Sequence, residues 1–182
     1  MRKVVGSLFI TLDGVTESPD QWQEHFDAEM LAELRNQIQT QDAMLLGRVT
    51  YEEWFPYWPT ATHEPFASHI NNVPKYVVST TLKQVEWGQF HNITLFKGSL
   101  AEEIAKLKAQ PGKNIGVNGS PSLIRSLLQN DLLDELRLAV HPVVANKGKR
   151  LFQDGNDLKR LKLIENTSTS TDTVILVYHP SR

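Results

Sequence analysis

The chain has 182 residues, of which 40% are hydrophobic and 22% charged, and its formal net charge is −2. This mixture fits one globular domain and argues against a broad nucleic-acid-binding surface. The chain has no cysteine, which excludes disulfides, thiol nucleophiles and cysteine-ligated zinc. No apolar run is long enough to cross a bilayer and no signal-peptide cleavage pattern follows the N-terminus, so we expect a cytoplasmic protein.

The first half of the chain alternates strand-like and helix-like segments. Apolar residues at helical spacing, such as Met30 and Leu34, mark the helices, and runs of apolar or β-branched residues mark the strands. In chain order we expect a strand over residues 4–12, a helix over about 24–39, a strand over 43–46, a helix over 48–55 and a strand over 75–79. Residues 57–72 are less regular and predict a flap or a short helix.

The second half becomes rich in strands towards its end. The expected elements are a strand over 93–96, a helix behind a capping box at Ser99, a strand over 114–117, a helix capped by Ser120, a strand around 136–140, and a hairpin with arms 161–166 and 173–179. This order predicts an α/β fold with a doubly wound, mostly parallel sheet and an antiparallel C-terminal edge hairpin. No linker divides the chain, so residues 1–182 are predicted to be one domain.

Three predicted strands end in groups that can donate hydrogen bonds to an anion. The segments are Gly47 to Thr50, which includes Arg48, then Ser79 with Thr80, and Asn118 to Ser120, which includes Gly119. Ligands of open α/β sheets lie outside the carboxyl ends of the strands, so together these segments predict a site for a multiply phosphorylated dinucleotide. The alternative is that the glycines only end strands, the serines only cap helices and Arg48 is solvated.

Carboxylates follow the first predicted strand and precede the first helix. Asp13, beside Gly14, is a candidate for orienting a reducible ring or relaying a proton, although the pair also makes a simple turn. Asp27 lies near the start of the first helix, where an acid is favoured by the helix dipole alone.

Several aromatic residues cluster early in the chain and could wall a pocket for a flat heterocycle. They are Trp22, Trp54, Phe55, Tyr57 and Trp58. We interpret Trp54 as a core residue and leave Trp22 and Trp58 open between pocket and surface.

Other kinds of site find little support in the sequence. The six histidines are scattered without metal-ligand spacing, so no metal site is predicted. No Gly-x-Ser-x-Gly elbow and no Gly-x-Gly-x-x-Gly fingerprint occurs, which argues against a hydrolase triad and a standard Rossmann site.

Several motifs together resemble a known family. Residues 45–52 (LLGRVTYE) resemble the strand-to-helix motif of the dihydrofolate reductase fold. Residues 132–136 (LLDEL), 141–144 (HPVV) and 148–152 (GKRLF) resemble bacterial relatives of the C-terminal reductase domain of the bifunctional riboflavin biosynthesis deaminase/reductase. The resemblance covers nearly the whole chain, from Lys3 to His179.

The resemblance implies an NADPH-binding reductase acting on a pyrimidine- or pterin-like small molecule. It assigns Gly47, Arg48 and Thr50 to the cofactor phosphates, Ser79 and Thr80 to the adenosine end, Gly119 and Ser120 to the pyrophosphate, and Asp13 with Gly14 to the nicotinamide loop. The riboflavin enzyme itself reduces a ribosylaminouracil phosphate. Trp22, Asp27 and Trp58 are the candidate substrate-binding residues.

The chain departs from the family pattern in two places and in its domain content. Asn118 stands where a glycine-rich pair is frequent, and Asn146 stands where glycine is usual, so the phosphate pocket could be altered. No zinc-binding deaminase domain precedes this one, so we expect a stand-alone reductase. We also expect the protein to form a homodimer. The alternatives are a regulatory protein that binds nucleotides without turnover, and a structural module acting through a homodimer.

Overall fold

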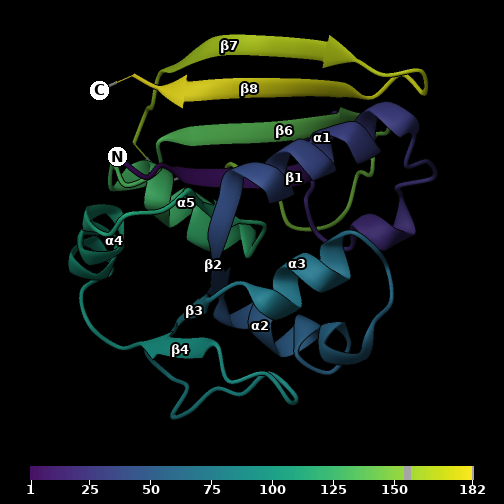
Figure 1. The fold of residues 1–182 in the computed structure, drawn as a ribbon. Helices are drawn as coiled ribbons and strands as arrows, with labels where there is room; N and C mark the ends of the chain where they lie inside the picture. The colour runs from purple at the N-terminus through teal and green to yellow at the C-terminus, as the bar shows by residue number, and fades with distance from the viewer. Residues whose placement is uncertain (154–156, 182) are drawn as a thin grey trace.

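A computed structural model describes residues 1–153 and 157–181. One sheet runs through the molecule in the strand order β4-β3-β2-β5-β1-β6-β8-β7 (Figure 1). The strands are β1 (Val4–Thr11), β2 (Gln41–Gly47), β3 (Lys75–Val78), β4 (Ile93–Phe96), β5 (Asn114–Val117), β6 (Glu135–His141), β7 (Leu161–Ser168) and β8 (Val174–Pro180). In this sheet order, each neighbouring pair of strands from β4 through β3, β2, β5 and β1 to β6 is parallel. Strand β8 is antiparallel to both β6 and β7. The predicted fold class is therefore confirmed.

Five α-helices and two short 3-10 helices connect the described strands. They are η1 (Pro19–Gln21), α1 (Ala28–Thr40), α2 (Arg48–Trp54), η2 (Trp58–Thr60), α3 (Phe66–Asn72), α4 (Leu100–Ala109) and α5 (Pro121–Gln129). Helix α1 begins later than predicted because Asp27 caps it, accepting a hydrogen bond from the backbone N–H of Met30 at 2.8 Å. The predicted capping box is wrong in detail, since Ser99 precedes α4 without a side-chain cap bond.

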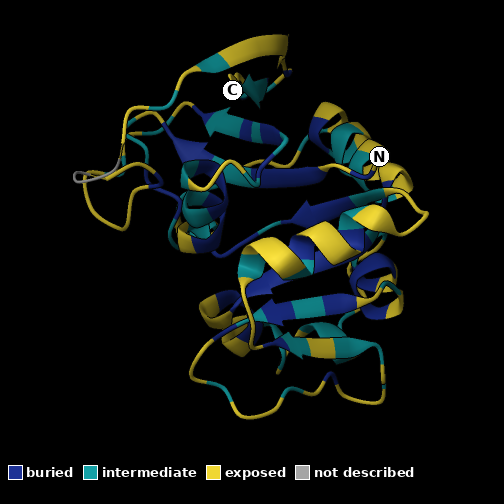
Figure 2. Cartoon of the chain, turned by 90° about the vertical axis from the view of Figure 1, so that its left-hand side faces the viewer, coloured by how far each residue is buried: buried dark blue, intermediate teal, exposed yellow. Residues whose placement is uncertain are grey.

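The two faces of the sheet carry separate apolar cores because side chains alternate along each strand. On β2, Ala43 and Leu45 pack into a core shared with α4 and α5, while Met44 and Leu46 pack into a second core with α2 and α3. The buried colour of the central strands contrasts with the exposed outer surfaces of the helices in Figure 2.

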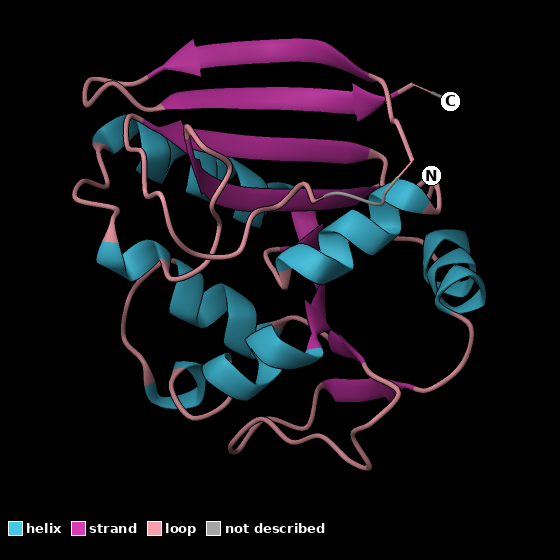
Figure 3. Ribbon diagram, turned by 180° about the vertical axis from the view of Figure 1, so that it is seen from behind, coloured by secondary structure: helices cyan, strands magenta, loops and turns pink. Residues whose placement is uncertain are grey.

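The C-terminal hairpin forms the antiparallel edge of the sheet (Figure 3). Strand β7 is the edge strand and is exposed along almost its whole length, including the apolar side chains Leu163 and Ile164. The opposite edge is β4, so the predicted doubly wound arrangement places β2, β5 and β1 in the interior of the sheet.

A fully buried lysine fixes the end of α3 against the sheet. The ammonium of Lys75 lies within hydrogen-bonding distance of four acceptors, the carbonyl oxygens of Ile70, Asn71 and Val73 and the side-chain oxygen of Asn92. Burial lowers the pKa of Lys75 to about 8, which still leaves it charged at neutral pH. The charge therefore satisfies the carbonyl group of Ile70 and shares those of Asn71 and Val73 with the side-chain amide of Asn92.

Replacing this lysine should destabilise the whole domain. Lys75→Met removes the donor and keeps a long apolar side chain, so we expect the free energy of unfolding to fall by about 3 kcal/mol. Urea denaturation followed by circular dichroism measures the change. Lys83→Met, at an exposed lysine, is the control and should leave stability unchanged; equal effects of the two substitutions would contradict a structural role for Lys75.

Candidate functional site

A cleft of about 1160 Å³ opens between the sheet and the segments that follow its central strands. Its walls come from β1, α1, α2, residues 58–66, the turn before α5, β6 and residues 149–153. Four of the predicted cofactor- and substrate-binding residues line it, namely Thr50, Trp58, Gly119 and Ser120. The structure thus brings the ends of β2 and β5 to one cavity.

Two glycines allow the ends of β2 and β5 to meet. The backbone N–H of Gly47 donates to the carbonyl oxygen of Gly119 at 3.2 Å. A Cβ atom on Gly47 would clash with the Ser120 hydroxyl, and a Cβ atom on Gly119 would lie 2.6 Å from Oγ1 of Thr50. Gly119 also has φ of +147°, a conformation that side chains disfavour. Gly47 itself does not line the cleft, but its missing side chain shapes the wall.

The start of α5 presents polar groups to the cleft. The hydroxyls of Ser120 and Ser122 lie 2.9 Å apart, and Arg125, one turn further, donates to the carbonyl oxygen of Leu151 at 3.0 Å. The side-chain oxygen of Asn118 is buried, lines the cleft and accepts no hydrogen bond from the described residues. An unsatisfied acceptor beside hydroxyls and a guanidinium suits a polar ligand with both N–H and phosphate groups.

The remaining predicted cofactor residues lie outside the cleft lining. Arg48 is exposed at the start of α2 and forms an ion pair with Glu52 at 2.7 Å. The Ser79 hydroxyl accepts backbone N–H bonds from Thr81 and Leu82, both at 3.1 Å, and so caps the turn after β3. Thr80, next to it, is exposed.

Asp13 ties two loops together. One carboxylate oxygen accepts from the Thr11 hydroxyl at 2.7 Å and from the N–H of Ala145 at 3.0 Å, and the other accepts from the N–H of Asn146 at 2.9 Å. The hydrogen bond from Thr11, with the backbone bonds, lowers the pKa of Asp13 to about 2. Asp13 and Gly14 are not among the residues that line the cleft, although Arg150, which pairs with Asp13, is.

Asp27 and Trp22 also make local contacts away from the cleft lining. The second oxygen of Asp27 accepts from the Thr171 hydroxyl at 2.6 Å, and although partial burial opposes ionisation, hydrogen bonds from Thr169 and Thr171 lower the pKa of Asp27 to about 2. Trp22 donates its indole N–H to the carbonyl oxygen of Glu17 and packs edge-on against His141. Both residues therefore organise the wall that surrounds the cleft.

Aromatic side chains line the part of the cleft between α1 and α2. Trp58 packs against Trp54 and Phe66, with ring centroids 5.9 and 4.8 Å apart, and Phe9 packs edge-on against Phe26 at 6.3 Å. All five line the cleft. Of the predicted aromatic set, Trp54 and Trp58 line the cleft, whereas Trp22, Phe55 and Tyr57 are not among the lining residues. Trp54 also packs against the second core.

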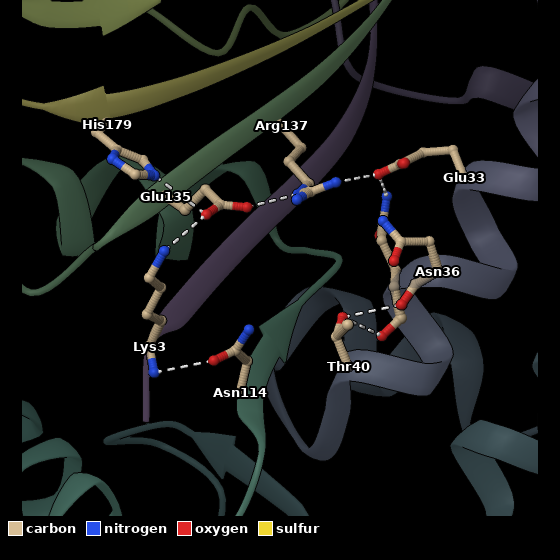
Figure 4. Close-up of polar contacts among 9 residues, drawn as sticks. Lys3, Glu33, Asn36, Thr40, Asn114, Glu135, Arg137 and His179 are labelled. Atoms are coloured by element: carbon tan, nitrogen blue, oxygen red, sulfur yellow. Dashed lines mark hydrogen bonds and ion pairs between the residues drawn. The ribbon is translucent and has the colours of Figure 1, made fainter. Parts of the chain in front are cut away.

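Sequence reasoning missed a buried charge network beside this wall. Arg137 on β6 pairs with Glu33 of α1 and with Glu135, 2.7 Å away, and Glu135 also contacts Lys3 and His179 (Figure 4). Burial opposes the negative charge of Glu135, but hydrogen bonds from the Arg137 guanidinium and the other donors nevertheless lower the pKa of Glu135. The pKa of Arg137 is raised by its two carboxylates, which outweigh its burial. In the sequence, the arginine between the apolar residues of β6 was a signal that this strand carries a charged partner.

The close approach of Gly119 to Thr50 is testable by mutation. Gly119→Ala should lower the free energy of unfolding by about 2 kcal/mol, because the new methyl group meets Thr50 and the positive φ becomes strained. Thermal and urea denaturation measure the effect. Gly98→Ala is the matched control, since its Cβ atom would lie 3.6 Å from the nearest side-chain oxygen; a neutral Gly119→Ala would show that the contact is not tight.

Within the described residues, no helix is long and apolar enough to span a membrane, and no group of three or more metal-ligating side chains comes together.

Comparison with known proteins identifies relatives of similar length. The chain is 32% identical over 185 residues to the Bacillus subtilis (strain 168) protein YyaP, covering 98% of this chain and 95% of the relative. It is 27% identical over 165 residues to YwjB of the same organism, covering 89% of each.

Solved structures share the fold. A pyrimidine reductase-like protein of Corynebacterium diphtheriae superposes with a TM-score of 0.68 at 15% identity, over 100% of this chain and 92% of that one. A Thermotoga maritima deaminase/5-amino-6-(5-phosphoribosylamino)uracil reductase gives 0.69 at 13% identity, and this chain covers 57% of it. The family model of the RibD C-terminal domain matches residues 2–176, and the chain belongs to that family.

Proposed function

We propose that the protein is an NADPH-dependent reductase that delivers hydride to a flat, pyrimidine- or pterin-like small molecule. The observation that carries this proposal is a single cleft that joins the polar start of α5 to an aromatic pocket. Membership of the RibD C-terminal domain family supports an oxidoreductase role.

The volume of the cleft supports two ligands rather than one. Pockets for a single drug-sized molecule range from about 300 to 1,000 Å³. The volume of the cleft, about 1160 Å³, exceeds that range. A dinucleotide lying partly in the cleft and a small heterocycle beside it would fill such a volume.

Residues of α2 and of the start of α5 fit the phosphate groups of the cofactor. Thr50, Ser120 and Ser122 provide hydroxyl donors, and Arg125 provides a charge. Outside the cleft lining, Arg48, Ser79 and Thr80 would hold the adenosine end of the cofactor. Arg48 would exchange its ion pair with Glu52 for one with the 2′-phosphate. The loop at Asp13 and Gly14 would border the nicotinamide.

The chain itself contributes binding, orientation and exclusion of water. NADPH supplies the hydride when bound. Trp54, Trp58 and Phe66 offer ring surfaces against which a flat heterocycle can stack. Holding the two rings face to face in a cavity with apolar walls is the main catalytic contribution that this geometry supports.

We further propose that the protein acts as a cytoplasmic homodimer. The edge strand β7 exposes unpaired backbone groups together with Leu163 and Ile164, which suits pairing with a second copy.

Cofactor titration tests the reductase proposal directly. The purified protein should bind NADPH more tightly than NADH, and Arg48→Ala should weaken NADPH about tenfold while leaving NADH nearly unchanged. Arg160→Ala, at an exposed residue preceding β7, is the control. Equal loss for the two cofactors removes Arg48 from the 2′-phosphate role, and no binding of either cofactor rejects the proposal.

A further inference from the structure

Hydride transfer to a heterocycle has to be completed by a proton. When hydride adds to the carbon of a carbon–nitrogen double bond, the electron pair of that bond moves onto nitrogen. A general acid within hydrogen-bonding reach supplies the proton at that atom, and it must both hold and release a proton near neutral pH. The titratable side chains that line the cleft differ in this ability.

The carboxyl groups of the described cleft lining are poorly suited to donate a proton. Carboxyl groups ordinarily titrate at about pH 4, and an ionised carboxylate only accepts hydrogen bonds. Two of those in the lining, Glu17 and Glu33, are also held in ion pairs with cations of the same lining. The acidic residues that line the cleft are Glu17, Asp20, Glu33, Glu53 and Glu64.

The cations of the described lining hold their protons too tightly. Three are arginines, Arg125, Arg137 and Arg150, and a guanidinium is not deprotonated in proteins. The other is Lys149, whose pKa is raised by the hydrogen bond and the charge of Glu17. The described lining contains no tyrosine, and the chain has no cysteine. The remaining side-chain type that ordinarily exchanges a proton between pH 5 and 8 is histidine.

His63 is the one histidine among the described residues that line the cleft. It lies between η2 and α3, and its imidazole stacks on the ring of Tyr57, with centroids 5.9 Å apart and 24° between the ring planes. Its backbone carbonyl oxygen accepts from the N–H of Ala67 at 3.0 Å. These contacts hold the backbone and one ring face, while no described residue forms a hydrogen bond with either ring nitrogen.

The imidazole is joined to the ring surfaces on which a flat ligand would stack. Tyr57 packs edge-on against Trp58 at 5.2 Å, and Trp58 packs edge-on against Phe66 at 4.8 Å. Trp58, Phe66 and His63 all line the cleft. This series of ring contacts brings an imidazole with free nitrogen atoms to the aromatic part of the cleft.

We propose that His63 is a catalytic residue of this cleft, the general acid that protonates a ring nitrogen of the substrate when hydride adds to the neighbouring carbon. The inference rests on the proposed reductase function, because it assigns the proton donor of the same reaction. The charged side chains of α2 and of the segment before α3 that line the cleft are Glu53 and Glu64. Both are acidic, so neither would repel a protonated imidazole.

The proposed step balances in atoms and electrons. Hydride leaves the reduced nicotinamide and forms the new carbon–hydrogen bond, while the second bond between carbon and nitrogen breaks. Its electron pair takes the proton from the imidazolium of His63 and forms a nitrogen–hydrogen bond. The nicotinamide is oxidised, the heterocycle is reduced, and the neutral imidazole regains a proton from water, which reaches it because His63 is exposed.

Binding measured without cofactor tests the contact between the imidazole and the ligand. The probe is 7,8-dihydrobiopterin, a pterin that has a carbon–nitrogen double bond and no phosphate group. Isothermal titration calorimetry should show about tenfold tighter binding to the unmodified protein at about pH 6 than at about pH 8, because a charged donor then faces the ring nitrogen. His63→Ala should remove this pH dependence.

His91→Ala is the matched control, since His91 is also exposed but is not among the residues that line the cleft. It should bind the probe as the unmodified protein does at both pH values. The inference is overturned if the unmodified protein binds the probe equally tightly at the two pH values, or if His63→Ala keeps the difference.

Oxidation of NADPH with the same probe tests the chemistry. His63→Ala should lower kcat about a hundredfold with little change in KM, a loss typical of removing a general acid. The kcat of the unmodified protein should fall as the pH rises from about 6 to about 8, and that of the variant should not. Added imidazole should restore part of the activity of His63→Ala, because the free base can donate from the vacated space; a residue with only a structural role would show no such rescue.

These outcomes are distinct from failure of the reductase proposal. A protein that binds neither NADPH nor NADH rejects the reductase, and binding of the probe that depends on pH through His63 would still retain the contact. A protein that oxidises NADPH with the probe at the same rate and with the same pH profile after His63→Ala retains the reductase and rejects His63 as the acid.

Discussion

The contact between Gly47 and the Gly119–Ser120 turn is the constraint on which the cleft depends. Parallel strands β2 and β5 are neighbours in the sheet, yet the helices that follow them, α2 and α5, pack into different cores. The two chain segments touch backbone to backbone because neither glycine has a side chain. Thr50 and Ser120 consequently reach the same cavity from opposite faces of the sheet, and a polar ligand can bridge two helix starts.

A second constraint is the ion pairing around the cleft. The loops after β1 and β6 hydrogen-bond to each other through Asp13 and carry Lys149 and Arg150 to one end. At the other end, α1 and β6 hold an arginine between two acids. Lys149 pairs with Glu17 and Arg150 with Asp13, so cations at both ends of the cleft are held in ion pairs, whereas Arg125 donates to backbone carbonyl groups.

The spacing of apolar residues along the chain predicted the architecture well, because strand alternation and helical periodicity depend on residues that are near one another in sequence. Strand ends of parallel sheets converge, and Thr50 and Ser120 accordingly line the same cleft. The spacing did not predict the Glu33–Arg137 pair, whose members are 104 residues apart. Nor did it decide the role of Asp13, because the N–H groups that bind this carboxylate lie 132 and 133 residues downstream. Such pairings depend on tertiary structure, which single-sequence patterns do not encode.

Helix α1 is supported on one side by a cavity instead of a core. Of its thirteen residues only Met30 is buried, and Leu31 and Leu34 line the cleft. Its backbone amides should therefore exchange with solvent deuterium sooner than those of α5, which buries four side chains. A ligand filling the cleft would supply the missing packing partner, so slower exchange along α1 would report occupancy even when no turnover occurs.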